Sequence, residues 1–580
     1  MHRFRVWAPQ AERLRVQVKG IKFPLQPAGG GWWHADVAEA GPGTDYAYFI
    51  DDEDLALPDP RSMWQPSGVH GASRVLDHTA FGWSDGGWQA PALSSAVIYE
   101  LHVGTFTPEG TLDAAQQKLD SLRELGITHV ELMPMNSFPG RQGWGYDGVD
   151  LFAPHEPYGG PEALKRFVDA CHAKGLAVLM DVVYNHLGPS GNYLGKFGPY
   201  FTDTHHTPWG AAVNLEQAGS HEVRRFFCDN ALMWLRDYHC DGLRLDAVHA
   251  YVDRSAINFM EQIAEEVHAL EAETGRHYVV IAESDLNDPR LVTAPEAGGY
   301  GLDAQWSDDF HHALVTALSE DRTGYYADFG SLEQIAKALR EVYVYAGRYS
   351  PYRNRIHGKP VRGLPAWRFL GYAQNHDQVG NRARGERLSH IISLGRAKIA
   401  AALVLTAPFV PMIFQGEEWA ASSPFQFFTN HDPELGKLVS EGRKKEFARF
   451  GWDPSDIPDP QAEETYERSK LKWGERSTGL HAEMLDWYRK LIALRRSTTD
   501  LLDGDLSAVR VRCSESGQWF VMERGRCTVA FSLAKEPVEV DVGPGLRMVL
   551  QSESGVRLHG SSVTLPPDSV AVLVEEAGGS

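Results

Sequence analysis

The sequence predicts an α/β protein, a (β/α)8 TIM barrel flanked by an N-terminal and a C-terminal β-sandwich module. Eight short apolar runs fill the middle of the 580-residue chain, and amphipathic stretches separate several of them, which is typical of a barrel of alternating strands and helices. Both ends contain short alternating runs divided by Gly/Pro turns, as small β-modules do. The competing fold, a doubly wound sheet, is disfavoured because no GxGxxG motif follows the first run.

The two ends predict the sandwich modules. Residues 1–92 contain the alternating runs FRVWAP, LRVQVK and YAYFI, with turns such as AGGGWW and EAGPGTD between them. Residues 496–580 return to this texture with VRVRC, QWFVMER, CTVAFSL, VEVDVG, RMVLQS and SVAVLVEE. We expect the last residues, EEAGGS, to fray.

The segment 93–495 predicts the barrel. Its eight candidate strands are AVIYELHVGTF, HVELMPM, AVLMDVVYNH, GLRLDAVHA, YVVIAES, GLDAQWSDD, FLGYAQNHD and FVPMIFQGEE. Helical patterns such as TLDAAQQKLDSLRELG and PEALKRFVDACHAKG lie between them, and the second begins with Pro and ends with Gly, as helices prefer. A charged, Pro-punctuated segment near 430–475 is predicted to be a helical insertion.

Composition excludes several classes of function. The formal net charge is −21, which makes general binding to nucleic acid or to an anionic membrane unfavourable. No run of 18 apolar residues occurs, and the first residues lack the apolar stretch of a signal peptide. The 5 Cys are odd in number and form no CxxC, so neither a disulfide framework nor a Cys-type zinc site is expected. A soluble cytoplasmic protein is the expectation.

Polar groups end one predicted strand after another. They are Asn185 and His186 at the third run, Arg244 and Asp246 at the fourth, Glu283 at the fifth, Asp308 and Asp309 at the sixth, His376 and Asp377 at the seventh, and Glu417 and Glu418 at the eighth. Any single one could be a helix N-cap. The whole set converges on one rim, where barrels of this type place their active sites.

Two carboxyl groups of this rim have contrasting surroundings. Period-two geometry puts Arg244 and Asp246 on the same side of their strand, and an adjacent Arg favours the ionised carboxylate that a nucleophile requires. Glu283 follows the apolar run VVIA, which favours the raised pKa of a general acid. This pairing is typical of glycoside cleavage, although a structural Arg–Asp pair and an unrelated Glu remain an alternative.

Four ordered motifs then resemble the α-amylase superfamily of glycoside hydrolases. They are DVVYNH at 181–186, DGLRLDAVHA at 241–250, VVIAES at 279–284 and QNHDQVGNR at 374–382. YELHVGTFT at 99–107 and WGYDGVDLFAPHEPYGGP at 144–161 resemble the branch that holds glycogen branching enzymes and malto-oligosyltrehalose trehalohydrolases. His249, the continuation NHDQVGNRARGERL, and the segments DDFHHALVTAL and FQGEEWAASSPFQFFTNHD are similar to the trehalohydrolases.

The resemblance implies a role for each matching position. Asp246 matches the nucleophile, Glu283 the proton donor and Asp377 the carboxylate that stabilises the transition state. It implies substrate contacts at His186, Arg244 and His376, and His249 is a further candidate. The residues that follow the sixth predicted strand are the first candidates for contacts on the leaving-group side: Asp308, Asp309, Phe310, His311 and His312. The next candidates are Gln378, Gly380 and Asn381. As in retaining enzymes, Asp246 and Glu283 should lie roughly 5–5.5 Å apart. Trp209, Trp306 and Trp419 are candidates to stack on glucose rings, with core packing as the alternative.

The implied reaction is hydrolysis of the α-1,4 bond next to a terminal trehalose unit, which releases trehalose from malto-oligosyltrehalose. Two alternatives remain: a branching transferase that uses the same carboxylates, and a non-catalytic carbohydrate-binding protein. The N-terminal module could bind glucan or shape the cleft. The resemblance also implies a metabolic link to a malto-oligosyltrehalose synthase. No cofactor and no metal is expected, because nothing supplies a full oxygen cage around Asn185.

Overall fold

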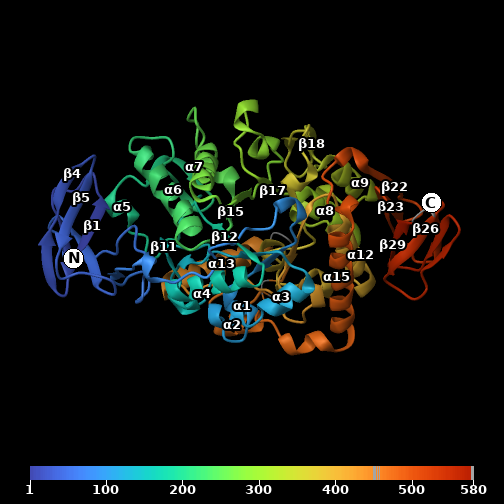
Figure 1. Ribbon diagram of the computed structural model, residues 1–580, viewed down its shortest axis with the longest axis horizontal. Coiled ribbons are helices and arrows are strands. Elements are labelled where there is room, and N and C mark those ends of the chain that lie inside the picture. Colours follow the sequence, from blue (N-terminus) through green and yellow to red (C-terminus); the bar gives the residue numbers. More distant parts are fainter. Residues whose placement is uncertain (449–451, 454, 456, 577–580) are drawn as a thin grey trace.

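The structure is a computed structural model that describes residues 1–448, 452, 453, 455 and 457–576. Three parts of the chain follow one another along the long axis of the molecule (Figure 1): an N-terminal β-module, a central α/β domain and a C-terminal β-module. Within the described residues, no helix is long and apolar enough to cross a membrane.

Eight parallel strands close into a barrel, so the predicted fold class is confirmed. Each of the eight predicted runs contains one barrel strand. In chain order these are β8 (Ile98–Leu101), β9 (His129–Leu132), β12 (Ala177–Val182), β15 (Gly242–Leu245), β16 (Val279–Ala282), β17 (Ala304–Trp306), β20 (Phe369–Gly371) and β21 (Val410–Phe414). All their residues are buried, because barrel strands face a packed interior on one side and helices on the other.

Helices cover the outside of the barrel. The main ones are α4 (Gly160–Ala173), α6 (Ser220–Arg236), α7 (Phe259–Thr274), α8 (Asp308–Ser319), α9 (Leu332–Glu341), α12 (Leu394–Thr406) and α15 (Gly479–Ser497). The N-cap Asn258 accepts from the backbone N–H of Met260, and Gly275 ends the same helix with a φ of 68°, a conformation that glycine adopts without steric cost. The pattern at 111–126 forms two short helices, α2 (Leu112–Gln116) and α3 (Leu119–Leu125).

The segment near 430–475 contains α13 (Pro433–Ala448) and α14 (Glu463–Arg468). Residues 449–451, 454 and 456 of this predicted insertion lie outside the described residues, as do 577–580 of the tail that was expected to fray. An antiparallel hairpin of β13 (Phe201–Thr207) and β14 (Gly210–Val213) and a short helix, α10 (His376–Gly380), follow barrel strands on the rim.

Each terminal module consists of two antiparallel sheets. The N-terminal sheets have the orders β1-β5-β4 and β3-β2-β6-β7, with β1 at His2–Trp7, β2 at Leu14–Val18, β3 at Ile21–Pro24, β4 at Gln26–Gly29, β5 at Trp32–Val37, β6 at Asp45–Ile50 and β7 at Ser73–Arg74. The C-terminal sheets have the orders β22-β23-β24-β29-β26 and β25-β28-β27. Their strands are β22 (Val509–Ser514), β23 (Trp519–Arg524), β24 (Cys527–Ser532), β25 (Val538–Asp541), β26 (Leu546–Gln551), β27 (Arg557–His559), β28 (Ser562–Leu565) and β29 (Ser569–Glu575).

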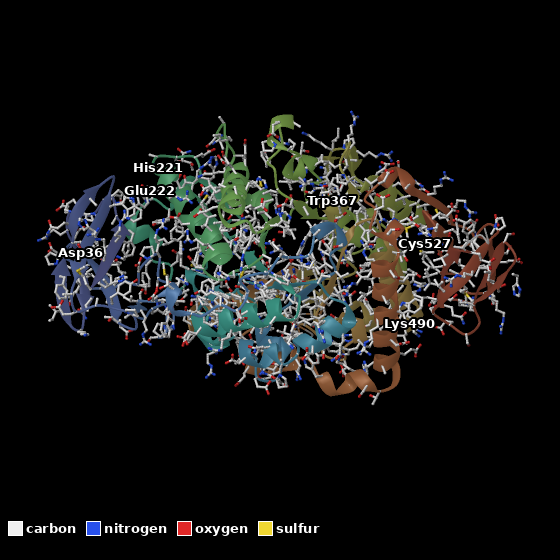
Figure 2. The ribbon with its side chains drawn as sticks, in the orientation of Figure 1. Asp36, His221, Glu222, Trp367, Lys490 and Cys527 are labelled. Carbon is white, nitrogen blue, oxygen red and sulfur yellow. The ribbon has the colours of Figure 1, made fainter. Side chains whose placement is uncertain are left out.

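Hydrogen bonds from polar side chains connect the two terminal β-modules to the barrel helices. Trp32 donates to Glu222 at the start of α6 over 3.0 Å, and Glu222 lies beside the N-terminal module in Figure 2. At the other end, Arg524 donates to the carbonyl oxygens of Thr406 and Ala407, which end α12. These contacts hold both modules against the barrel while its rim stays accessible.

Candidate active site

A cavity of about 430 Å³ opens at the carboxyl ends of the barrel strands. Its walls come from segments that are far apart in the sequence. The lining residues are Trp144, Tyr146, Asp147, His186, Trp209, Asp246, Ala247, His249, Glu283, His376, Asp377, Asn381 and Phe427. The structure therefore brings the three predicted catalytic carboxylates, His186, His249, His376 and Asn381 to one place.

Asp246 follows β15 and is held by the arginine of the same strand. Arg244 is fully buried, and its Nη1 lies 2.7 Å from Asp246 Oδ1 and 2.8 Å from Asp181 Oδ2. Asn185 Nδ2 donates to the other oxygen of Asp246 over 2.7 Å. Because both carboxylate oxygens accept charged or strongly polar donors, the Asp246 side chain is held in a fixed orientation.

Glu283 comes directly after β16. Its Oε2 accepts from the backbone N–H of Ala247 over 2.5 Å and lies 3.6 Å from Arg244 Nη2. Ala247 has a φ of 40°, an unusual conformation for a residue with a Cβ. Burial raises the pKa of Glu283 well above its ordinary value, and the nearby charge of Asp246 adds to this effect although Arg244 opposes it. The sequence-based prediction of a raised pKa is therefore confirmed.

Asp377 is the most accessible of the three carboxylates. It stands in the first turn of α10, where Asn375 caps the helix, and its side chain is 45% exposed. The residue before it, His376, is buried and lies with its Nε2 3.6 Å from Asp377 Oδ1. Asn381 donates to Asp377 Oδ1 over 3.3 Å. Asp377 thus faces the cavity, ready to approach a positive centre in a bound ligand.

A tryptophan on the β13–β14 hairpin forms one wall. Trp209 is 49% exposed and stacks on the ring of His186, with ring centroids 4.7 Å apart and planes 9° from parallel. Its free face is available for a sugar ring. The other two candidates, Trp306 and Trp419, are buried in the core, so the alternative interpretation, core packing, applies to them.

None of the predicted substrate-contact residues at 308–312 lines this cavity. Only Asp308 interacts electrostatically with a residue that does, Asp377. Phe310 is buried and packs against Phe409 with ring centroids 5.2 Å apart. Asp309 accepts from the side chain of Asn287 and from the backbone N–H of Tyr345. Asp308 accepts from Tyr372, and its pKa is raised to about 7, mainly by burial and in part by the nearby charge of Asp377.

The two adjacent histidines are also internal. His311 lies 3.1 Å from the hydroxyl of Tyr326, and His312 is surrounded by aromatic rings. Burial lowers the pKa of His311 to about 3. Because α8 begins at Asp308, its successive side chains turn through about 100° each, and most of them enter the layer between helix and barrel. The prediction that Asp309, Phe310, His311 and His312 contact substrate does not agree with this placement.

Of the three candidates that follow Asp377, only Asn381 lines the cavity, and Gln378 and Gly380 do not. Gln378 accepts from Tyr325 and Tyr326, outside the cavity lining. Gly380 packs so closely on Trp144 that a Cβ would lie 2.0 Å from its ring. Arg443 of α13 donates to the carbonyl of Gly380 and to Asn381 Oδ1, so the inserted helix helps to position the cavity wall.

Several residues of the site were not predicted. Trp144, Tyr146, Asp147 and Phe427 line the cavity, and Glu100 holds His376 from below through two hydrogen bonds. The WGYD motif at 144–147 resembles the family, yet nothing in the sequence alone indicates that its side chains line the site. Among the described residues, no group of three or more His, Cys, Asp and Glu is arranged to hold a metal ion.

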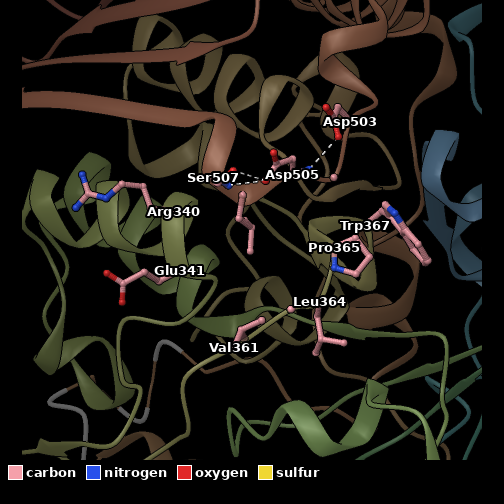
Figure 3. A pocket seen from close by; sticks show the side chains of 12 residues that line it. Arg340, Glu341, Val361, Leu364, Pro365, Trp367, Asp503, Asp505 and Ser507 are labelled. Atoms are coloured by element: carbon pink, nitrogen blue, oxygen red, sulfur yellow. Dashed lines mark hydrogen bonds between the residues drawn. The ribbon is translucent and has the colours of Figure 1, made fainter. Parts of the chain in front are cut away.

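A larger cavity, of about 700 Å³, lies between α9, the segment before β20 and the connection to the C-terminal module (Figure 3). Trp367, Asp503 and Asp505 are among its lining residues. Asp505 accepts from the backbone N–H and the hydroxyl of Ser507. Its carboxylate therefore caps the short 3-10 helix Leu506–Ala508. This cavity is at the amino end of β20, away from the rim on which the three carboxylates meet.

Comparisons with known proteins agree with this geometry. Residues 74–202 match the family "Alpha amylase, catalytic domain", and residues 504–572 match "Domain of unknown function (DUF3459)". The malto-oligosyltrehalose trehalohydrolase of Rhizobium sp. is 50% identical over 98% of this chain and 97% of that protein. A 1,4-alpha-glucan branching enzyme of Burkholderia thailandensis is 33% identical over 52% of this chain and 42% of its own length. The crystal structure of a putative alpha amylase from Salmonella typhimurium has a TM-score of 0.91 at 36% identity and covers 99% of this chain and 97% of its own.

Proposed function

The chain belongs to the malto-oligosyltrehalose trehalohydrolase family of the α-amylase superfamily, and we propose from this premise that it hydrolyses the α-1,4-glucosidic bond next to the terminal trehalose unit of malto-oligosyltrehalose and releases trehalose. One observation carries the proposal for the site. Asp246, Glu283 and Asp377 face one cavity at the carboxyl ends of the strands, and Arg244 contacts the first two.

The first half of the reaction forms a covalent intermediate. A carboxylate oxygen of Asp246 attacks the anomeric carbon, and the bond from that carbon to the leaving oxygen breaks. Glu283 gives its proton to the leaving oxygen, so trehalose departs as a neutral alcohol. The raised pKa of Glu283 supports this role because it keeps the carboxyl protonated until the leaving group needs the proton.

The second half releases the shortened malto-oligosaccharide. Glu283, now ionised, takes a proton from water while the water oxygen attacks the anomeric carbon and displaces Asp246. The enzyme returns to its starting protonation state, and the anomeric configuration is retained. Asp377, at the edge of the same cavity, stabilises the positive charge that develops on the sugar in both transition states.

We assign binding roles to the side chains around these carboxylates. His186 and His249 line the cavity and offer ring nitrogens to sugar hydroxyl groups, and His376 forms part of the same wall. Trp209 supplies an exposed aromatic face. Asn381, which lines the cavity and is held by Arg443, is our candidate for a contact with the leaving trehalose unit.

The alternative activity is a branching transferase, in which a sugar hydroxyl attacks the intermediate in place of water. The similarity to the branching enzyme of Burkholderia thailandensis covers 52% of the chain, whereas that to the trehalohydrolase of Rhizobium sp. covers 98%. This difference in coverage favours hydrolysis.

We further propose a place in trehalose biosynthesis and a cytoplasmic location. A malto-oligosaccharide whose reducing end has been converted to trehalose must be supplied by another enzyme, a malto-oligosyltrehalose synthase. Among the described residues the five cysteines are free thiols, which suits a reducing compartment.

Product analysis tests the proposed function. The purified protein is incubated with malto-oligosyltrehalose and, separately, with amylose, and the products are separated chromatographically. The expected result is free trehalose and a malto-oligosaccharide shortened accordingly. If no trehalose is formed and amylose gains α-1,6 branches, the transferase is the correct activity.

A further inference from the structure

Glu100, on the first barrel strand β8, makes two hydrogen bonds to His376 inside the barrel. Its Oε1 lies 2.5 Å from His376 Nδ1, and its Oε2 accepts the backbone N–H of His376 over 3.0 Å. Both side chains are 1% exposed. The carboxylate therefore fixes the ring and the backbone of the residue that precedes Asp377.

The other nitrogen of the same ring also needs a proton. His376 Nε2 lies 2.8 Å from the hydroxyl oxygen of Tyr146. Tyr146 donates its own hydrogen to Asp181 Oδ2 over 2.6 Å, so toward His376 it can only accept. Nδ1 donates to Glu100 and Nε2 donates to Tyr146, which requires the doubly protonated imidazolium.

We propose that Glu100 is a positioning residue that keeps His376 in the imidazolium form, so that its two N–H groups lock Tyr146 and the start of α10 in the arrangement that hydrolysis needs. Its catalytic consequence rests on the function proposed above. The ring itself stands next to the reacting groups, with its Nε2 3.6 Å from Asp377 Oδ1. A cation there attracts the Asp377 carboxylate and helps to align it.

The charged groups around the ring are consistent with this form. Burial opposes the cation, but Glu100 and Asp377 outweigh it and raise the pKa of His376 to about 9, while Arg244 on β15 lowers it. Asp181 on β12 adds a negative charge on the far side of Tyr146. The groups that surround the ring from other elements are Glu100, Glu131, Asp181, Arg244, Tyr146 and His102.

The neighbouring strand offers a matched comparison. Glu131 pairs with Glu100 in the register of β8 and β9, and it is equally buried. Unlike Glu100, it has no hydrogen-bond partner within the described residues. Burial raises its pKa well above the ordinary value, and the charge of Glu100 adds to this. Glu100 is thus hydrogen-bonded to His376, whereas the raised pKa of Glu131 keeps its carboxyl protonated, and it makes no hydrogen bond to the ring.

The amide variant at position 100 changes the ring for a defined reason. In Glu100→Gln, the single carbonyl oxygen must accept the backbone N–H of His376, so the amide NH₂ faces Nδ1. A donor opposite Nδ1 requires that nitrogen to be unprotonated, and the ring becomes neutral. Glu131→Gln replaces one neutral group by another and leaves the ring unaltered.

The experiment reads the ring directly by ¹⁵N NMR of histidine-labelled full-length protein, with His376 assigned by its loss in His376→Asn. The wild-type ring and that of Glu131→Gln should keep imidazolium shifts up to a pH of about 9, and the Glu100→Gln ring should be neutral at pH 7.5. Glu100→Asp, which keeps the charge, should retain the imidazolium. The proposal would be overturned if the wild-type His376 ring titrated near the ordinary pKa of about 6.5. It would also be overturned if the His376 ring of Glu100→Gln kept the wild-type imidazolium shifts.

Kinetics on malto-oligosyltrehalose supply the second readout. Glu100→Gln should lose roughly 10- to 100-fold in kcat/KM at neutral pH, as when a carboxylate that orients a functional histidine is removed, and its alkaline limb should move to lower pH. Glu131→Gln should keep the wild-type profile, and an equal shift in both variants would contradict a specific role of Glu100. A wild-type protein that releases no trehalose would disprove the proposed function, while the NMR result would still decide the state of His376.

Discussion

Arg244 Nη1 donates to Asp246 Oδ1 over 2.7 Å, from a guanidinium that is completely buried in the barrel. The two residues are two positions apart at the end of one strand, so their side chains emerge on the same side. The same nitrogen also contacts both oxygens of Asp181. One cation therefore compensates two buried carboxylates and reaches toward Glu283 as a third.

Removing this cation should destabilise the protein strongly. Arg244→Met leaves Asp181 and Asp246 without a buried counter-charge, which typically costs about 3–5 kcal/mol. Arg3→Met is the matched control, since Arg3 pairs with Asp36 at the surface with side chains 62% and 38% exposed, where an ion pair contributes about 0–1 kcal/mol. Urea unfolding of both variants measures the difference. A loss at Arg244 no larger than that at Arg3 would contradict the buried role.

Asp246→Ala should abolish hydrolysis while largely sparing the fold. The substitution removes the proposed nucleophile, and loss of a group that forms the covalent intermediate should lower kcat on the order of 10⁴-fold or more. Arg244 keeps its ion pair with Asp181, so the buried cation still has a counter-charge. Trehalose release and circular dichroism are measured together. Activity that survives in a folded variant would remove Asp246 from the mechanism.

Trp209→Ala should weaken substrate binding without affecting stability. Stacking of this kind contributes about 0.5–1.5 kcal/mol, which corresponds to a rise in KM of roughly 2- to 10-fold. Trp209→Phe keeps an aromatic face and should recover part of the loss. The comparison variant is Trp367→Ala, in the separate cavity of Figure 3, whose KM should stay at the wild-type value. Equal changes at both positions would argue against a sugar contact at Trp209.

Stability should fall as the pH rises from about 4.5 to 7 because of Glu418. Burial raises the pKa of this carboxyl to about 7, so between these values the folded state keeps a proton that the unfolded state has released. The folded state binds more protons, and the free energy of unfolding therefore decreases with rising pH. Glu418→Gln can still accept from Tyr99 and should lack this loss. Unfolding at pH 5 and pH 8 tests it, and parallel slopes for both proteins would exclude Glu418 as the source.

A second group whose stabilisation is lost with rising pH lies at the amino end of the barrel. His172 lies 2.9 Å from both Asp85 and Asp241, and although burial opposes its charge, these carboxylates raise its pKa. Its stabilisation is complete below the unfolded pKa of about 6.5 and is lost as the pH rises through the raised folded value.

Asp85→Asn should therefore cost about 1–3 kcal/mol near pH 6 and less at pH 9. Unfolding free energies at the two values measure this change. The control is Asp77→Asn, an exposed helix cap nearby where asparagine also caps well, and it should change little at either pH. A cost at Asp85 that is constant from pH 6 to pH 9 would show that His172 is not the titrating group.

Sequence patterns were most informative where one local feature decides the structure. The runs that became β12, β15 and β16 combine apolar residues with a terminal polar motif, and each forms a barrel strand with that motif at its carboxyl end. Glu283 was expected to have a raised pKa because apolar residues precede it, and burial in the folded chain has this effect.

Predictions that depended on side-chain direction around a helix were less successful. Asp309 and Phe310 follow a strand end as closely as Asp246 does, yet α8 turns them away from the cavity. Nothing in the sequence distinguishes Glu100 or Glu131 as a site residue, because a carboxyl inside an apolar run gives no indication of what it faces. Glu100 is bound to His376, whereas Glu131 is unpartnered among the described residues. This difference arises from a residue that lies 276 positions after Glu100.

The sequence by itself determined the barrel, its two flanking β-modules and the carboxyl groups that end the strands, because hydrophobic period and strand-end polarity are local properties of the chain. Only the tertiary structure decided which of those groups share a cavity, which of them Arg244 contacts, and that Glu100 holds His376 through two hydrogen bonds. Burial and hydrogen-bond direction depend on contacts between distant segments, and these exist only when all eight strands have closed around the same interior.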